Sequence, residues 1–265
     1  MSRGSAGVHA RNYILAGLPD ADRALLDRHV GDVPLVQGQL LHAAGLPVQH
    51  IYFPHSGVIS LLSPLRDGQA IKVATVGREG VAGTIHLLGS NLSPVRSKVQ
   101  VAGSAARIAV GAFTDAFIAS AAIRGSVIDY NEVLLCQIQT TAACNALHPV
   151  EERLARWVLQ TADRIDNKPV PLTQEILSQM LGVQRTSVTL VARALQAAGL
   201  IRYSRGQIHI LRRDELEGAA CECYGAIRAR IESAQAAVKA LNRGEPRRDP
   251  EATFQAACCP SKLVP

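Results

Sequence analysis

The sequence predicts an α+β protein with a strand-rich N-terminal half, a long central helix and a C-terminal region of short helices with a hairpin. Three observations support this fold class. Short β-branched and apolar runs alternate with turn residues up to about residue 110. Apolar residues then recur every three or four positions from about residue 127. Finally, residues 172–211 read as helix, tight turn, helix and hairpin.

Length and composition exclude several classes of protein. The chain has 265 residues, of which 48% are hydrophobic and 19% charged, so it can bury a core and is not expected to be intrinsically disordered. A membrane span needs about 20 consecutive apolar residues, and the most apolar stretches are interrupted by polar residues such as Asp129 and Glu132. The first residues lack the apolar core of a secretory signal. We therefore expect a cytoplasmic protein whose six cysteines stay reduced.

The N-terminal domain is expected to span residues 12–125. Pro19 and Asp20 open a short helix. Five strand-like runs follow, QHIYF, GVISLL, AIKVATV, SKVQVAG and ARIAV, separated by turn residues at 54–57, 67–68 and 77–80. Short, evenly spaced strands of this kind predict an antiparallel barrel or roll.

A long helix over residues 126–148 carries two apolar stripes. The second stripe is Ile128, Leu135, Ile138 and Ala142. Two stripes allow one face to bury against the chain's own domain and the other against a second subunit, or both to be buried within a monomer. We expect a dimer seam along the first stripe, whose members are Tyr130, Leu134, Gln137, Thr141 and Cys144.

The third domain is expected at residues 149–215, because Pro149 ends one helix and suits the first turn of the next. A stripe that includes Trp157 points inward on that helix. Residues 216–265 are predicted to add a helical extension, broken near Gly218 and Gly225, and a disordered tail from Asn242.

The segment from Leu172 to Arg213 concentrates the positive charge of the chain. It holds six arginines and one glutamate, which gives +5 of the total formal charge of +6. Thr173 suits a helix N-cap, and Gly182 suits the tight turn between two helices. A second helix over about residues 184–198 precedes a hairpin whose turn lies at 204–207. The segment therefore predicts a winged helix-turn-helix with a phosphate-binding surface.

Polar and cationic side chains on this segment form a candidate DNA interface. The second helix buries its apolar stripe and keeps hydrogen-bonding residues outside, as expected of a helix that enters the major groove. Only 4% of the residues are aromatic, which disfavours stacking on single strands and favours duplex DNA. A module that uses this motif only for protein contacts is the alternative. The candidate DNA-binding residues are Thr173, Gln174, Gln184, Arg185, Thr186, Ser187, Thr189, Arg193, Arg202 and Arg205.

The order of these parts resembles the Crp/Fnr family of bacterial transcription regulators over about residues 49–213, including VGREGVAG in the strand-rich region. The resemblance implies a cyclic-nucleotide-binding-type β-roll, a dimerisation helix and a winged helix-turn-helix in a homodimer that binds DNA and RNA polymerase. It also implies that Arg185 reads guanine. Thr186 stands where well-known members have Glu, and Leu190 where they have Arg, so their half-site is not expected here.

The resemblance also implies an effector site in the roll. Gly83, Thr84, Arg96 and Ser97 occupy the positions of the family's phosphate-binding and ribose-binding residues. Thr84 replaces the Glu that holds the ribose hydroxyl, which disfavours cyclic AMP. The expectation is a small-molecule effector of unidentified chemistry. The alternatives are a cyclic-nucleotide-responsive regulator and a solvated Arg96 that binds nothing.

Cysteines and histidines are the remaining candidates for chemistry. No cysteine precedes Cys136, unlike the N-terminal cluster of oxygen-sensing family members. Cys221 with Cys223, and Cys258 with Cys259, lack the usual zinc-knuckle spacing, so we expect small buried thiols and no metal site, with their role left open. A cupin-like enzyme built on His42, His50 and His55 is not expected, since no closely spaced histidine pair precedes a Glu.

Overall fold

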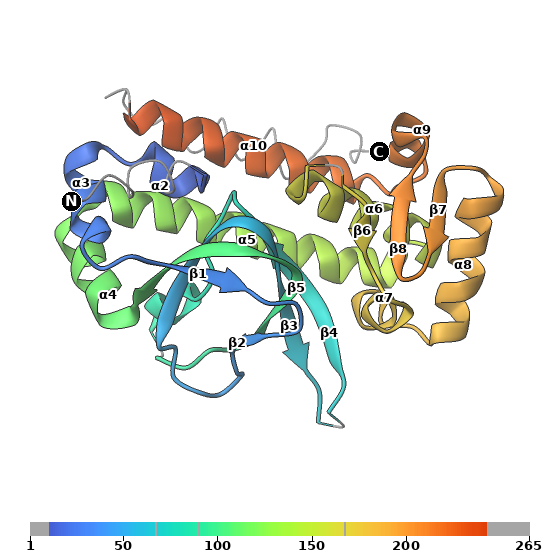
Figure 1. The fold of residues 1–265 in the computed structure, drawn as a ribbon, viewed down its shortest axis with the longest axis horizontal. Coiled ribbons are helices and arrows are strands. Elements are labelled where there is room, and N and C mark those ends of the chain that lie inside the picture. Colours follow the sequence, from blue (N-terminus) through green and yellow to red (C-terminus); the bar gives the residue numbers. More distant parts are fainter. Residues whose placement is uncertain (1–10, 67, 90, 167, 243–265) are drawn as a thin grey trace, which may run out of the picture.

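The computed structural model describes residues 11–66, 68–89, 91–166 and 168–242. The long helix α5 (Ala121–Leu147) lies between a β-roll on one side and helix α10 (Cys223–Asn242) on the other (Figure 1). The helix-turn-helix lies at one end of the molecule, at the far end from the short N-terminal helices α2 (Tyr13–Gly17) and α3 (Asp20–Asp27).

The β-roll is antiparallel throughout, as predicted. Its strands follow the order β1-β5-β3-β4, and β2 also pairs with β5. Ile51, Phe53 and Ile108 are fully buried in its core, which continues into the buried face of α5. The strands are β1 (Gly31–Leu35), β2 (Leu40–His42), β3 (His50–Pro64), β4 (Ala70–Val76) and β5 (Arg96–Ala109), with a 3-10 turn at Thr84–Leu88.

Strands β3 and β5 are longer than the sequence predicted, because each joins two of the expected short strands. The predicted turn at residues 54–57 is instead a set of register shifts inside β3. Gly57 has φ +82°, and a Cβ there would lie 2.6 Å from the carbonyl oxygen of Val101. Glycine therefore lets the strand bulge and bend over β5 without ending it.

Helix α5 follows α4 (Val110–Ala119). Most of its first stripe packs against the chain's own roll, whereas Cys144 packs against Cys221 and Cys223. The side-chain oxygen of Gln137 accepts hydrogen bonds from the backbone N–H and hydroxyl of Thr75 (2.8 and 3.1 Å). The predicted dimer seam is therefore wrong, because these side chains lie within the monomer. Its five residues, Tyr130, Leu134, Gln137, Thr141 and Cys144, are all buried. Ile128 and Leu135 of the second stripe remain 53% and 54% exposed.

The C-terminal helices surround a second core centred on Trp157. Helix α10 continues through Gly225, where a break was predicted, because a single glycine costs a helix only about 1 kcal/mol. The predicted tail after Asn242 lies outside the described residues. The remaining elements are α6 (Val150–Arg164), β6 (Val170–Pro171), α7 (Gln174–Leu181), α8 (Arg185–Ala197), β7 (Ile201–Ser204), β8 (Gln207–Ile210) and α9 (Arg213–Gly218).

Buried polar contacts join the roll to α6, the first helix of the C-terminal region. Arg164 Nε donates to Glu79 at 2.7 Å, and both side chains are almost fully buried. Lys72 of β4 places its Nζ 4.1 Å from the ring centre of Trp157. Helix α7 also packs against β4. Across the described ranges, no helix has the length and apolar content needed to cross a bilayer.

Candidate nucleic-acid interface

Local capping and a left-handed turn fix the geometry of α7 and α8. The hydroxyl of Thr173 accepts from the backbone N–H of Ile176 at 3.2 Å and so caps α7. Gly182 ends α7 with φ +64°, a conformation that glycine adopts without strain. Ser178 donates to the carbonyl of Val183 across the same turn. Both predictions at Thr173 and Gly182 are confirmed in the structure.

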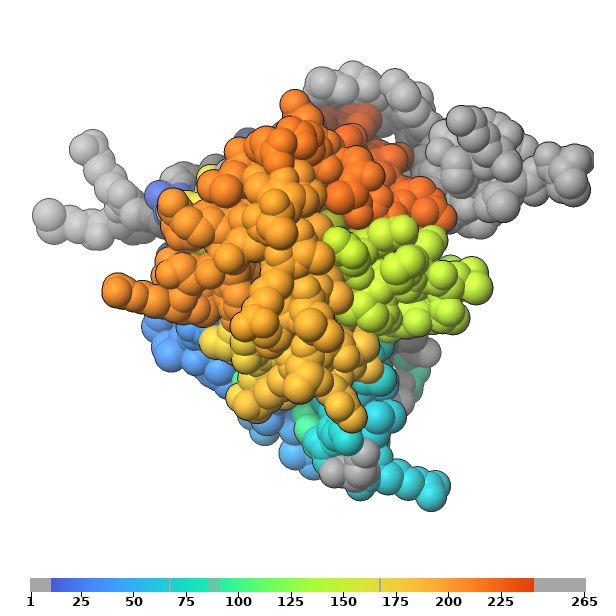
Figure 2. All heavy atoms as spheres, turned by 90° about the vertical axis from the view of Figure 1, so that its right-hand side faces the viewer, coloured from blue at the N-terminus to red at the C-terminus, as the bar shows by residue number. Residues whose placement is uncertain are grey.

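The buried face of α8 leaves a polar outer face toward solvent. Val188, Ala192 and Leu195 enter the core around Trp157. The outer surface of α7, α8 and the hairpin forms this end of the molecule (Figure 2). The structure places eight of the predicted DNA-binding residues in exposed positions, and Ser187 and Thr189 in half-buried ones. The exposed eight are Thr173, Gln174, Gln184, Arg185, Thr186, Arg193, Arg202 and Arg205.

A hydrogen bond ties the two helices together at this surface. Gln174 Nε2 donates to the hydroxyl of Thr189 at 3.2 Å, and that hydroxyl donates to the carbonyl of Arg185 at 3.0 Å. Arg185 also lies 3.4 Å from the carboxylate of Glu175, with both side chains more than 60% exposed. An exposed ion pair of this kind is weak, so a phosphate or a guanine can displace the carboxylate.

The outward-facing charge is smaller than the sequence count suggested. Arg212 pairs with Glu215 at 2.8 Å, and Arg213 pairs with Asp163 and Glu217. These two arginines therefore form ion pairs within the protein. Arg185, Arg193, Arg202 and Arg205 remain as the cationic surface of the helix-turn-helix and hairpin.

The hairpin of β7 and β8 is held against the end of α8. The backbone N–H of Tyr203 donates to Gln196 Oε1 of α8 at 2.8 Å. Arg205 and Gly206 both have positive φ (51° and 73°), which is typical of a tight two-residue hairpin turn. The turn at residues 204–207 thus forms as predicted and carries Arg205 at its tip, while Arg202 lies on β7 opposite His209.

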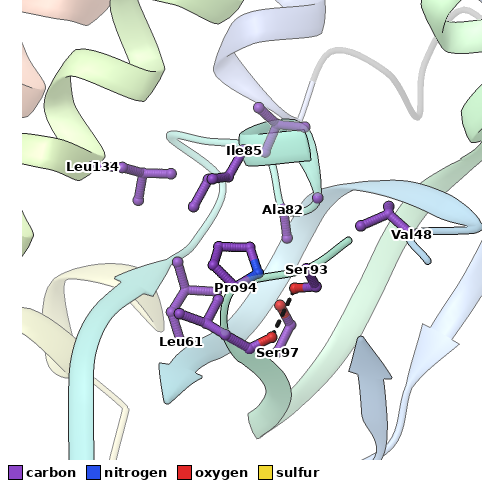
Figure 3. Close-up of a pocket in the computed structure, with 11 residues that line it drawn as sticks. Val48, Leu61, Ala82, Ile85, Ser93, Pro94, Ser97 and Leu134 are labelled. Carbon is purple, nitrogen blue, oxygen red and sulfur yellow. Dashed lines mark hydrogen bonds between the residues drawn. The ribbon is translucent and has the colours of Figure 1, made fainter. Parts of the chain in front are cut away.

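The predicted effector residues do not line a nucleotide-sized pocket. Gly83 and Ser97 border a cavity of about 10 Å³ beneath α5, which is roughly the space of one water molecule (Figure 3). Ser97 Oγ lies 3.0 Å from His42 Nδ1, and Thr84 donates to Asn131 of α5 at 2.8 Å. Arg96 is half-buried on β5 and is not part of the cavity wall. In this conformation, side chains of the protein itself fill the site.

A larger cavity of about 280 Å³ lies where the turn after β4, α6 and α10 meet. Arg78, Glu79 and Arg164 line it together with Tyr224 and Arg228. Sequence patterns do not predict this cavity, because its walls come from segments far apart in the chain.

The three histidines considered for a cupin-like site have separate structural partners. His42 Nε2 lies 2.8 Å from the carbonyl of His50, and His55 Nε2 lies 3.1 Å from Asp32. In the part of the chain that the structure describes, none of the three belongs to a group of metal-ligating side chains.

Comparisons with known proteins agree with this architecture. Residues 152–219 match the family model of the Crp-like helix-turn-helix domain. No curated protein matches the sequence of the chain.

Solved structures match most of the chain. FixK2 from Bradyrhizobium japonicum is 14% identical with a TM-score of 0.62, over 72% of this chain and 98% of its own. The c-di-GMP-responsive global regulator CLP from Xanthomonas campestris is 16% identical with a TM-score of 0.60, over the same shares. A CRP/FNR-family transcriptional regulator from Thermus thermophilus is 17% identical with a TM-score of 0.56, again over 72% and 98%. The chain therefore combines a Crp-like helix-turn-helix domain with the fold of the Crp/Fnr transcriptional regulators, which confirms the resemblance that its sequence predicted.

Proposed function

We propose that this protein is a homodimeric transcription regulator that binds a palindromic or near-palindromic duplex site through α8 and the hairpin. The observation that carries the proposal is the outer face of the helix-turn-helix, where four arginines and several hydroxyl and amide side chains face solvent. Such a face supplies phosphate contacts from arginine and hydrogen bonds to base edges from the start of a recognition helix.

Arg185, at the first position of α8, is the proposed base-reading residue. A guanidinium there can donate two hydrogen bonds to O6 and N7 of guanine, which discriminates against other bases by about 1–3 kcal/mol. Leu190 is 67% exposed on the same helix, and an apolar side chain there suits a thymine methyl group. Arg202 and Arg205 would contact the backbone phosphates beside the groove.

The proposed dimer forms through the exposed stripe of α5. Ile128, Leu135 and Ala142 are exposed and spaced by seven residues, and half-buried Ile138 lies beside them. A seven-residue repeat of this kind suits a two-stranded coiled coil. Two chains joined there would present two copies of α8, which a palindromic site requires about 34 Å apart.

Selection of bound sequences from random DNA tests the proposal directly. The expected result is a two-fold symmetric motif with one strongly specified guanine in each half-site. Binding should weaken steeply with salt, because arginines displace counterions from phosphates. Arg193→Ala should reduce affinity and the salt slope, whereas Arg28→Ala, an exposed arginine at the end of the distant α3, should change neither. If no motif is enriched, or if binding does not depend on salt, the proposal of sequence-specific DNA binding is contradicted. The alternative of a module that contacts only proteins would then be favoured.

The roll is the proposed effector domain, with a ligand whose chemistry is not identified. Because the cavity beside Gly83 and Ser97 has room for only about one water molecule, we expect calorimetry with cyclic AMP or cyclic di-GMP to give no binding heat. Saturable heat from either nucleotide would show that the roll opens to admit it.

A further inference from the structure

Three cysteines and one histidine converge where the end of α5 meets the connection between α9 and α10. Cys144 lies in the last turn of α5, and His148 caps that helix four residues later, so both side chains share one face. Cys221 lies in the connection, and Cys223 is the first residue of α10. One ligand atom from each of the four residues lies within 4.8 Å of every other.

The spacing of these atoms fits a tetrahedral zinc ion. With Zn–S bonds of about 2.3 Å and Zn–N bonds of about 2.0–2.1 Å, tetrahedral geometry puts sulfur atoms about 3.8 Å apart and sulfur about 3.6 Å from nitrogen. The Sγ atoms of Cys144 and Cys221 are 3.5 Å apart, and Cys223 Sγ is 3.6 Å from His148 Nδ1. A disulfide would need a sulfur separation of about 2.05 Å.

The surroundings of His148 match those of a metal-bound imidazole. Its Nδ1 faces the sulfur atoms, while its Nε2 lies 3.2 Å from the carboxylate of Glu222. A carboxylate on the second ring nitrogen holds the ring in the orientation that leaves the first nitrogen free to bind metal.

A buried arginine can balance the charge of such a centre. Zn²⁺ with three thiolates and a neutral imidazole carries one net negative charge. Arg156 of α6 is fully buried, and within the described ranges none of its guanidinium nitrogens has a hydrogen-bond partner. The guanidinium of Arg156 lies close enough to Cys144 and Cys221 to act on both electrostatically.

We propose that Cys144, His148, Cys221 and Cys223 bind one Zn²⁺ ion. All four positions of the tetrahedron come from the protein, so the site is structural and leaves no open position for catalysis. Thiolate ligands favour zinc over magnesium or calcium. The ion would join the C-terminal end of α5 to the start of α10, beside Pro149, where the chain enters the DNA-binding region.

The spacing of Cys221 and Cys223 in the sequence predicts buried thiols and no metal site here. Cys221 and Cys223 are indeed buried, but the completing ligands lie on a helix more than 70 residues earlier. Only the packing of α10 against α5 brings the two pairs together. Cys258 and Cys259 lie outside the described residues.

Metal analysis of the full-length protein tests this site. The assay uses a Cys258→Ser, Cys259→Ser background, so that no other C-terminal thiols compete. After equilibration with zinc and removal of the excess, we expect one zinc per chain by elemental analysis. Replacement by Co²⁺ should give the intense visible absorption of a tetrahedral thiolate site.

Ligand variants then assign the metal to these four residues. Cys221→Ser and Cys144→Ser should each weaken zinc binding by more than the about 10- to 100-fold expected for Glu222→Gln. Cys136→Ser, a half-buried cysteine elsewhere on α5, should keep full stoichiometry. His148→Ala should lose zinc, whereas His148→Cys should restore it. Circular dichroism of each variant shows whether lost binding follows from unfolding, and the rescue by His148→Cys does not depend on that control.

Several outcomes would overturn the proposal. They are an absence of bound zinc in the folded protein, unchanged stoichiometry in Cys144→Ser and Cys221→Ser, iron with inorganic sulfide in place of zinc, and a mass lower by two hydrogens that marks a disulfide between these cysteines.

Discussion

Replacing Leu135 with glutamate tests which face of α5 joins two copies of the chain. Leu135 is 54% exposed on the second stripe, so the exchange disturbs little within the monomer. In the proposed dimer, the same position would bury its exposed half against the partner helix. The variant would instead place a carboxylate there, close to its copy in the other chain.

The expected magnitude follows from the exposed fraction. Full burial of a leucine side chain stabilises by about 1.5–3 kcal/mol, so its exposed half contributes about 1 kcal/mol per chain and about 2 kcal/mol per dimer. At about 1.4 kcal/mol per tenfold change, this loss raises the dissociation constant of the dimer about 30-fold. Desolvation of two facing carboxylates raises the dissociation constant further.

Sedimentation equilibrium measures the dissociation constant, and titration of a palindromic site measures the effect on DNA binding. Leu40→Glu is the matched control, because Leu40 is 52% exposed on β2 and away from α5. The control should remain dimeric. A Leu135→Glu protein as dimeric as the wild type would refute the assignment of this face.

Three further predictions concern single side chains. Arg185→Ala should cost about 1–3 kcal/mol on the selected site and relax specificity at one base pair; an equal loss on all sequences would indicate a phosphate contact. Gly57→Ala should destabilise the fold by about 1–3 kcal/mol in urea unfolding, because φ +82° and the carbonyl of Val101 both oppose a side chain, and an unchanged midpoint would contradict this. Burial, with repulsion from nearby arginines, lowers the pKa of Lys72 well below its usual range, so the wild type should lose stability as pH falls below the unfolded value of about 10.4. Lys72→Met should remove this dependence of stability on pH. Parallel profiles of stability against pH for the wild type and the variant would contradict the prediction.

Local sequence signals predicted most of the elements correctly. Thr173, Gly182 and the turn at residues 204–207 act through hydrogen bonds and backbone angles within a few residues, so their identity is enough. The same holds for the outward face of α8, since helical spacing alone separates buried from exposed positions. The merged strands β3 and β5 were missed because the bulge at Gly57 depends on the neighbouring strand.

The two stripes of α5 show a structural feature that the sequence alone does not determine. Helical periodicity determined that this helix has two faces to bury, yet both faces satisfy the same pattern. The structure places most of the first stripe against the roll, where Gln137 accepts a hydrogen bond from Thr75 and the ring of Tyr130 packs against Gly80.

By itself, then, the sequence determined the α+β class, the helix-turn-helix with its hairpin, and the concentration of arginine around it. Tertiary structure alone decided which stripe of α5 stays exposed and which arginines form ion pairs with Asp163, Glu215 and Glu217. It also decided that Cys144 lies in contact with Cys221. The physical reason is the range of the interactions. Caps, turns and periodicity act between near neighbours in the chain, whereas ion pairs and ligand clusters join residues that only folding brings within a few ångströms.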